Sequence, residues 1–106
     1  MEKVLILIWL HFIADFVFQS DKVALNKSRY ISILTFHAMF YAVPFVLFGA
    51  IFAAFNGALH FVVDLFSSRI ASHYWSIENR HAFFVTIGLD QAIHVSALVI
   101  SLTWFT

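Results

Sequence analysis

Long stretches without lysine or arginine constrain the fold of this chain more than any other feature. Four such apolar stretches, each close to the length of a membrane-spanning helix, cover about residues 4–19, 31–48, 51–68 and 81–104. A helix needs roughly 20 apolar residues to cross the hydrocarbon core of a bilayer. The chain is 62% hydrophobic and 11% charged, whereas a soluble domain is about 45–50% apolar and about 25% charged. The sequence therefore predicts an all-α, multi-pass membrane protein, with residues 1–106 forming one domain of four transmembrane helices arranged as two helical hairpins.

The basic residues predict how these helices are oriented. The polar segment at 21–30 holds three of them and the polar segment at 69–80 holds two, while Lys3 is the one expected on the other side of the bundle. Cytoplasmic loops of membrane proteins carry an excess of lysine and arginine. We therefore expect both polar loops in the cytoplasm and both termini on the external side.

Three features predict local geometry within the second and third helices. Pro44 lacks a backbone N–H, so it is expected to kink the second helix in its distal half. Gly49 and Ala50 are the expected turn between the second and third helices. Ala53 and Gly57 lie one helical turn apart, and small residues at that spacing let a neighbouring helix approach closely.

Polar side chains lie inside all four predicted helices. Such groups are costly at membrane depth, so they usually face the interior of a bundle and indicate a functional site. In the first helix they repeat every four residues, which places them on one face. The full set is His11, Asp15, Gln19, His37, His60, Asp64, Asp90, Gln91 and His94.

The three carboxylates of this set predict a bound cation or bound protons. No lysine or arginine lies inside the predicted helices, and unpaired anions in a low dielectric are strongly unfavourable. Without cysteine, the available ligands are imidazole and carboxylate, which suit Zn, Mn or Fe. Because the set exceeds the needs of one tetrahedral ion, either two ions share it or some aspartates orient a ligating histidine. The predicted metal ligands are His11, Asp15, His37, His60, Asp64, Asp90 and His94.

A short internal repeat supports the division into two hairpins. Leu-His-Phe-Ile-Ala-Asp at 10–15 resembles Leu-His-Phe-Val-Val-Asp at 59–64. Repeats that run in the same direction are related by an axis along the membrane normal, and binding sites tend to form between them.

The competing interpretation of the polar residues inside the helices is that they only hydrogen-bond the helices together. His73 and His81, in or beside the second loop, are expected to be ordinary interface residues.

The same polar pattern resembles that of a protein family. His-x-x-Ala-Asp-Phe-x-x-Gln begins at His11, His37 follows in the second helix, His-x-x-x-Asp begins at His60, and Asp-Gln-x-x-His begins at Asp90. This pattern resembles the family called domain of unknown function 3307, small integral membrane proteins of bacteria and phages. The resemblance implies a multi-pass protein of a bacterial or phage-encoded inner (plasma) membrane, but no activity.

The leading hypothesis is a membrane-embedded, metal-dependent hydrolase. Asp15 or Asp64 would act as general base and Gln19 and Gln91 as further cofactor-binding groups. The substrate would be a lipid, a prenyl-linked molecule or a membrane-inserted peptide at the inner leaflet. A cation or proton transporter or sensor, which would need a homo-oligomer, is the main alternative. A b-type haem protein and a structural accessory subunit are further ones, and the zero net charge gives no sign of nucleic acid binding.

Overall fold

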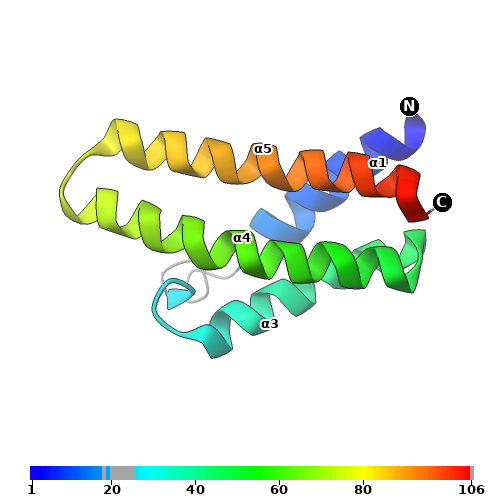
Figure 1. The fold of residues 1–106 in the computed structure, drawn as a ribbon, viewed down its shortest axis with the longest axis horizontal. Coiled ribbons are helices and arrows are strands. Elements are labelled where there is room, and N and C mark those ends of the chain that lie inside the picture. The colour runs from blue at the N-terminus through cyan, green and yellow to red at the C-terminus, as the bar shows by residue number, and fades with distance from the viewer. Residues whose placement is uncertain (18, 20–25, 106) are drawn as a thin grey trace.

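The computed structural model describes residues 1–17, 19 and 26–105, and helices account for most of these residues. The described residues contain no β-strand, so the prediction of an all-α protein is confirmed. In chain order the elements of Figure 1 are α1 (Glu2–Phe12), the π-helix η1 (Ile13–Val17), α3 (Ile31–Ala42), the 3₁₀-helix η2 (Val43–Phe48), α4 (Ala50–Ser76) and α5 (Arg80–Phe105).

Three helical segments are long and apolar enough to cross a membrane. They are Ile31–Phe48, Ala50–Ser76 and Arg80–Phe105, with mean hydropathies of 1.9, 1.5 and 1.7. The helical stretch at the N-terminus consists of 11 residues in α1 and 5 in η1. At 1.5 Å per residue it measures about 24 Å, which is shorter than the roughly 30 Å of a hydrocarbon core. The structure thus supports three membrane-spanning helices, and a fourth stays a prediction.

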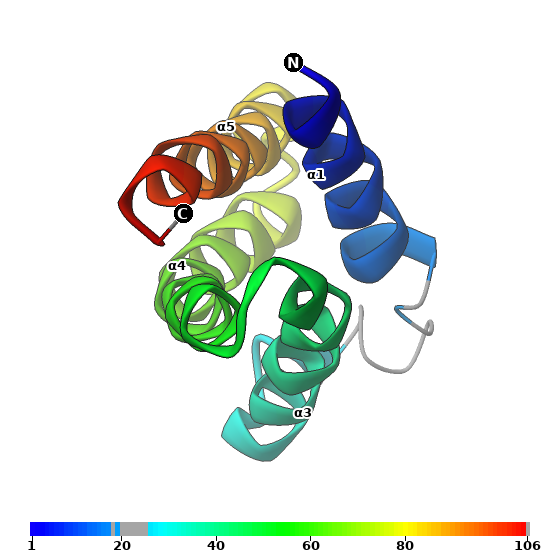
Figure 2. The same cartoon turned by 90° about the vertical axis from the view of Figure 1, so that its right-hand side faces the viewer.

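Helix α4 is the central element of the fold. It packs against α5 on one side and against α3 and η2 on another, while α1 contacts α5 and η1 contacts α3. Figure 2 shows α4 between α5 and α3, with α1 on the far side of the interior. Both chain ends lie at one end of the molecule, and the connection between α4 and α5 lies at the other end (Figure 1). Below, we call the end with this connection the loop end.

The predicted helix boundaries differ most after the third span. Helix α4 continues to Ser76, so the prediction of a loop over 69–80 was wrong for residues 69–76, and only 77–79 separate α4 from α5. Polar residues did not end the helix because its outer face is exposed there, as at Arg69 and Ser72. Of the predicted loop at 21–30, residues 21–25 lie outside the described residues.

The expected break and turn around Pro44 are both present. The α-helical pattern changes to a 3₁₀-helix at Val43, next to Pro44, because proline cannot supply the backbone N–H that the α-helix needs. Gly49 then adopts a φ of 118° between η2 and α4. This conformation is readily available to glycine alone, which explains the position of the turn.

An apolar cluster fills the interior toward the chain ends. Its four most buried members from separate helical segments are between 0% and 1% exposed: Leu7, Phe45, Phe52 and Leu98. In every case the nearest buried histidine on the same helical segment lies further toward the loop end. The interior therefore has an apolar layer next to the chain ends and a polar layer beyond it.

Close packing of α3 on α4 depends on Gly57. A Cβ atom built at Gly57 would lie 2.8 Å from Ala42 Cβ, which is inside normal van der Waals contact. The alanine methyl group cannot rotate away, so α3 would have to move. The prediction that small residues at 53 and 57 allow close approach of a neighbouring helix is confirmed at Gly57.

Replacing Gly57 with alanine should therefore lower the free energy of unfolding, although alanine favours helix. Overpacking costs about 1–3 kcal/mol, against a helix-propensity gain of up to about 1 kcal/mol. Gly88→Ala is the matched control, because no atom lies within 4 Å of a Cβ built there. Unfolding in SDS, followed by circular dichroism, should show Gly57→Ala less stable than the parent and Gly88→Ala at least as stable. Equal stability of the two variants would contradict the close approach.

Candidate metal centre

Four buried side chains from three helical segments converge in the polar layer. Each is at most 4% exposed, and each offers one ligand atom to a group whose members all lie within 4.8 Å of one another. We call Asp15 of η1, His37 of α3, and His60 and Asp64 of α4 the quartet. The quartet thus brings together four members of the predicted polar set that lie far apart in the chain.

The distances within the quartet match those of a tetrahedral metal site. His37 Nε2 lies 3.0 Å from Asp15 Oδ1 and 3.4 Å from Asp64 Oδ2. His60 Nε2 lies 3.6 Å from Asp15 Oδ1, 3.3 Å from Asp64 Oδ2 and 3.0 Å from His37 Nε2. Tetrahedral ligands at 2.0–2.2 Å from a zinc ion lie about 3.3–3.6 Å from one another. These five separations bracket that value, so the four atoms can hold one ion.

The donor set of the quartet also requires something between its atoms. Ionised carboxylates only accept hydrogen bonds, and a neutral imidazole carries one N–H and one acceptor nitrogen. Both Nε2 atoms face each other at 3.0 Å while they also face carboxylate oxygens. With neutral histidines and no cation, these contacts must therefore bring either two lone pairs or two N–H groups against each other.

Stacking holds the His60 ring in place. The ring stacks on Tyr41, with a centroid distance of 3.9 Å, and on His94, with a centroid distance of 4.2 Å. Among the described residues, His60 Nδ1 has no hydrogen-bond partner, so stacking and the contacts of Nε2 orient the ring. Tyr41 was missed by sequence reasoning, because an aromatic residue in an apolar span looks like packing.

A directed hydrogen-bond chain connects Tyr41 to Asp15. Gln91 Nε2 donates to Asp15 Oδ2 at 3.2 Å and to Asp90 Oδ2 at 2.9 Å, so its Oε1 accepts from His11 Nε2 at 2.6 Å. His11 Nδ1 must then accept, and it receives the Tyr41 hydroxyl at 2.8 Å. Both His11 nitrogens are thereby occupied, which places the residue outside the quartet and gives it a role in orienting Gln91.

The remaining polar residues of α5 lie beside the quartet. Asp90 Oδ1 accepts a hydrogen bond from Ser67 Oγ at 2.5 Å, and Asp90 Oδ2 lies 3.3 Å from His94 Nδ1. His94 is 2% exposed, and neither ring nitrogen has a hydrogen-bond partner among the described residues. Asp64, Asp90 and His94 also offer ligand atoms within 4.8 Å of one another.

Lys27 supplies a positive charge that the sequence analysis did not count. Its ammonium lies 3.2 Å from Asp64 Oδ2, although Lys27 precedes α3 and lies outside every predicted span. The charge balance predicted from the sequence included only residues inside the predicted spans. The usable signal was the length of the side chain, since lysine stems commonly extend several ångströms along apolar surface.

A cavity of about 180 Å³ opens beside the quartet. Asp15 and Asp64 line it from the quartet, and Asp90 lines it from α5. Gln19 and Gln91, the two predicted cofactor-binding residues, line it as well. His73 and His81 are exposed and outside this region, as expected for ordinary interface residues. A small molecule or water in this cavity would contact the carboxylates directly.

The π-helix η1 changes how the first helix presents its polar face. Sequence spacing predicted a regular α-helical stripe through residue 19, but residues 13–17 form a wider turn around Asp15. His11 Nε2 and Asp15 Oδ2 remain 3.9 Å apart, so those two share a face as expected. Single π-helical turns inside α-helices occur frequently at functional sites.

No curated protein and no solved structure matches the chain. A family match covers residues 4–106 and so includes the whole quartet, the hydrogen-bond chain and the residues that line the cavity. The family description names no activity, so the function has to be argued from the site. Because the match covers nearly all of the sequence, this protein belongs to the family described as Protein of unknown function (DUF3307).

Proposed function

We propose that this protein binds one divalent transition metal ion (Zn, Mn or Fe) at the quartet and catalyses hydrolysis at the membrane boundary. The observation that carries the proposal is the convergence of two imidazole nitrogens and two carboxylate oxygens at tetrahedral ligand spacing. Mixed imidazole and carboxylate ligands suit these metals. All four ligands are buried, which would protect such an ion from water on most sides.

The charge balance of the polar layer supports a single divalent ion. Asp15, Asp64 and Asp90 carry three negative charges when ionised, and Lys27 carries one positive charge. With neutral histidines, two positive charges are missing in a region where unpaired charge is strongly unfavourable. One divalent ion supplies both of them.

The chain's own residues then provide the proton transfer. Because four quartet atoms would complete a tetrahedral shell, an ion held there could act on water only through a fifth position open to the cavity, where it would lower the pKa of water toward neutrality and so supply a nucleophile. Asp15 and Asp64, the bases predicted from sequence, are both occupied as quartet members. Asp90 lines the cavity outside the quartet, and Ser67 and Gln91 fix its two oxygens. We therefore assign the general-base role to Asp90.

Asp90→Asn should separate binding from catalysis. We expect the purified variant to keep most of its metal, because the quartet is intact, and to lose about 10²–10⁴-fold in rate, the usual contribution of a general base. Bis-(p-nitrophenyl) phosphate and p-nitrophenyl laurate are suitable probes, and Glu2→Gln, an exposed carboxylate far from the quartet, is the matched control. A parent protein that holds metal but hydrolyses neither probe faster than free metal would count against the hydrolase.

The second candidate is a proton or cation carrier, and the His37–His60 contact favours it. One proton shared between the two Nε2 atoms, 3.0 Å apart, would satisfy the same atoms as a metal ion. A proton carrier would contain no stoichiometric metal after purification, and any carrier would need a homo-oligomer to build a complete path. Metal analysis therefore distinguishes the hydrolase from a proton carrier, and turnover of a hydrolase substrate distinguishes it from a metal carrier.

We further propose that α1 and η1 form a fourth span of an inner membrane protein with both termini outside. Both ends of the chain lie at the same end of the fold (Figure 1). Arg80 begins α5 at the opposite end, Arg69 lies in the last third of α4, and Lys27 contacts Asp64 of α4. The excess of basic residues predicts that the loop end is cytoplasmic. Alkaline phosphatase fused to the C-terminus should be active and a green fluorescent protein fusion dark. The reverse pattern would overturn this topology.

A further inference from the structure

We propose that the groove next to the quartet binds the alkyl chain of an amphiphile whose phosphate head group reaches Lys27. This rests on the proposed hydrolase and names its substrate class: a lipid or prenyl phosphate rather than a peptide. The groove is separate from the cavity described above and has a volume of about 330 Å³.

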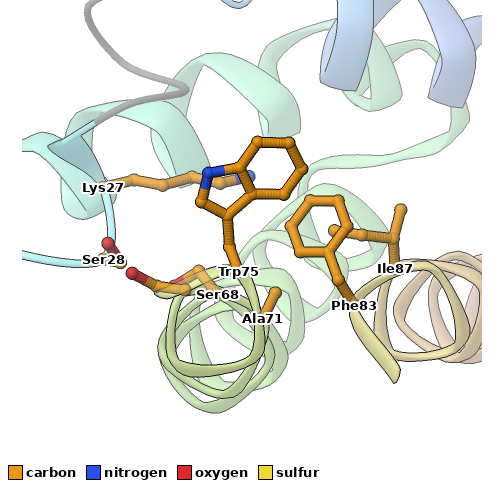
Figure 3. A pocket seen from close by; sticks show the side chains of 8 residues that line it. Lys27, Ser28, Ser68, Ala71, Trp75, Phe83 and Ile87 are labelled. Atoms are coloured by element: carbon orange, nitrogen blue, oxygen red, sulfur yellow. The ribbon is translucent and has the colours of Figure 1, made fainter. Parts of the chain in front are cut away.

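The groove is apolar along most of its length. Figure 3 shows its walls, which come from the segment before α3, from α4 and from α5. Trp75 of α4 and Phe83 of α5 pack edge to face with ring centroids 4.9 Å apart, and Ala71 is only 3% exposed. A wall of this kind excludes water and accepts a flexible hydrocarbon chain, whose transfer from water stabilises by about 0.8 kcal/mol per CH₂ group.

The polar end of the groove continues into the cavity beside the quartet. Lys27, Ser68 and Ile87 line both spaces, so a ligand can occupy the two at once. A chain lying along the wall formed by Trp75 and Phe83 would place its head group at Lys27, next to Asp64. A second apolar hollow between α4 and α5 shares Ser67 and Asp90 with the cavity, but Lys27 does not line it. Lys27 also does not line the hollow at Gly57, so the lysine distinguishes the groove from both.

Two cations at or beside the groove favour an anionic head group. Lys27, whose side chain is 17% exposed, lies where the groove meets the cavity. The guanidinium of Arg80 stacks on the groove residue Trp75, 3.6 Å from the ring centroid. Phosphate is a strong acceptor for lysine and arginine, and a divalent ion in the quartet would offset the nearby carboxylates. A neutral or cationic head group would lack these partners.

Fluorescence of Trp75 tests the proposal directly. In a Trp9→Phe, Trp104→Phe background, Trp75 is the remaining tryptophan. We expect 12-bromododecyl phosphate, added to protein in neutral detergent, to quench its emission saturably. 12-Bromododecanol lacks the phosphate and so loses one charge-assisted contact. We expect it to bind about tenfold more weakly than the phosphate. Inorganic phosphate should not displace the brominated chain, because it lacks the apolar portion; displacement would show that only a free anion binds, and the proposal would fail.

Two variants separate binding in the groove from simple partition into the micelle. Ser72 is exposed and lines the groove, so Ser72→Phe should fill it and abolish saturable quenching. Ser96→Phe, at an exposed position in the other half of α5, should leave the quenching unchanged.

A third variant tests the head-group contact. Lys27→Gln should lower the affinity for 12-bromododecyl phosphate about tenfold and leave the affinity for 12-bromododecanol unchanged. Equal quenching in all of these proteins would overturn the proposal.

The test also distinguishes failure of the groove from failure of the metal site. Metal content is measured on the same samples, with and without chelator. Bound metal without saturable quenching would reject the amphiphile and leave the metal site standing. Saturable quenching without bound metal would keep the groove and reject the hydrolase.

Discussion

His60→Ala is expected to lose most of the bound metal, while His73→Ala keeps it. His60 Nε2 makes three of the five ligand separations measured in the quartet, and its ring is completely buried. Alanine therefore removes one of the four ligands of the quartet. His73 is an exposed imidazole near the end of α4, which makes it a matched control for the loss of a histidine as such. Metal per protein, measured by plasma mass spectrometry after purification in detergent, gives the result.

The alternative roles of His60 predict different amounts of bound metal. If His60 only joins helices, both variants will contain as little metal as the parent. If a second set of residues, such as Asp64, Asp90 and His94, holds the ion, His60→Ala will retain it. Either result would reject the quartet as the metal centre.

Removing the metal with a chelator should lower the melting temperature by roughly 10–20 °C, and returning it should restore the value. A ligand present at 100 times its Kd stabilises the folded state by about 2.7 kcal/mol, and about 4–8 °C corresponds to 1 kcal/mol in a domain of this size. The buried carboxylates would also repel one another once the ion has left. Melting followed by circular dichroism, with and without chelator, measures the shift.

Asp15→Asn tests whether the metal stabilises the fold by neutralising buried anions. Asparagine removes one anion from the quartet, so the metal-free variant should melt at or above the metal-free parent, although it binds metal less well. If Asp15 only accepts a hydrogen bond from His37 at 3.0 Å, the variant should instead melt lower under both conditions. No effect of chelator on the parent would favour protons as the balancing charge.

The spacing of histidine and aspartate in the sequence predicted much of the site. Inside apolar helices each such residue has one physical solution, which is to face the interior, and the structure buries all seven predicted ligands there. Their division into a quartet and its neighbours could not be predicted. The repeat makes His11 and His60 equivalent in sequence, but His11 bonds Tyr41 and Gln91 instead.

The residues that sequence reasoning missed share a physical cause. Tyr41 and Lys27 act through long side chains, and the helical pattern reports where a Cα lies rather than how far a side chain extends. The wider turn at Ile13–Val17 was equally invisible, because α- and π-helices have no separate apolar pattern at this length. Apolar length predicted Ile31–Phe48 closely but placed the end of α4 too early, since exposed polar residues extend a helix as readily as they end it.

The apolar layer formed by Leu7, Phe45, Phe52 and Leu98 closes the polar layer toward the chain ends. These side chains, between 0% and 1% exposed, fill the interior between the chain ends and the quartet. The cavity and the groove both open on the opposite side of that layer, around Lys27. In this conformation a molecule beside the quartet has no passage through that layer toward the chain ends. A carrier that moves its cargo from one end of the molecule to the other would therefore have to displace Phe45 and Phe52 in every cycle, whereas the proposed hydrolase would need no such movement.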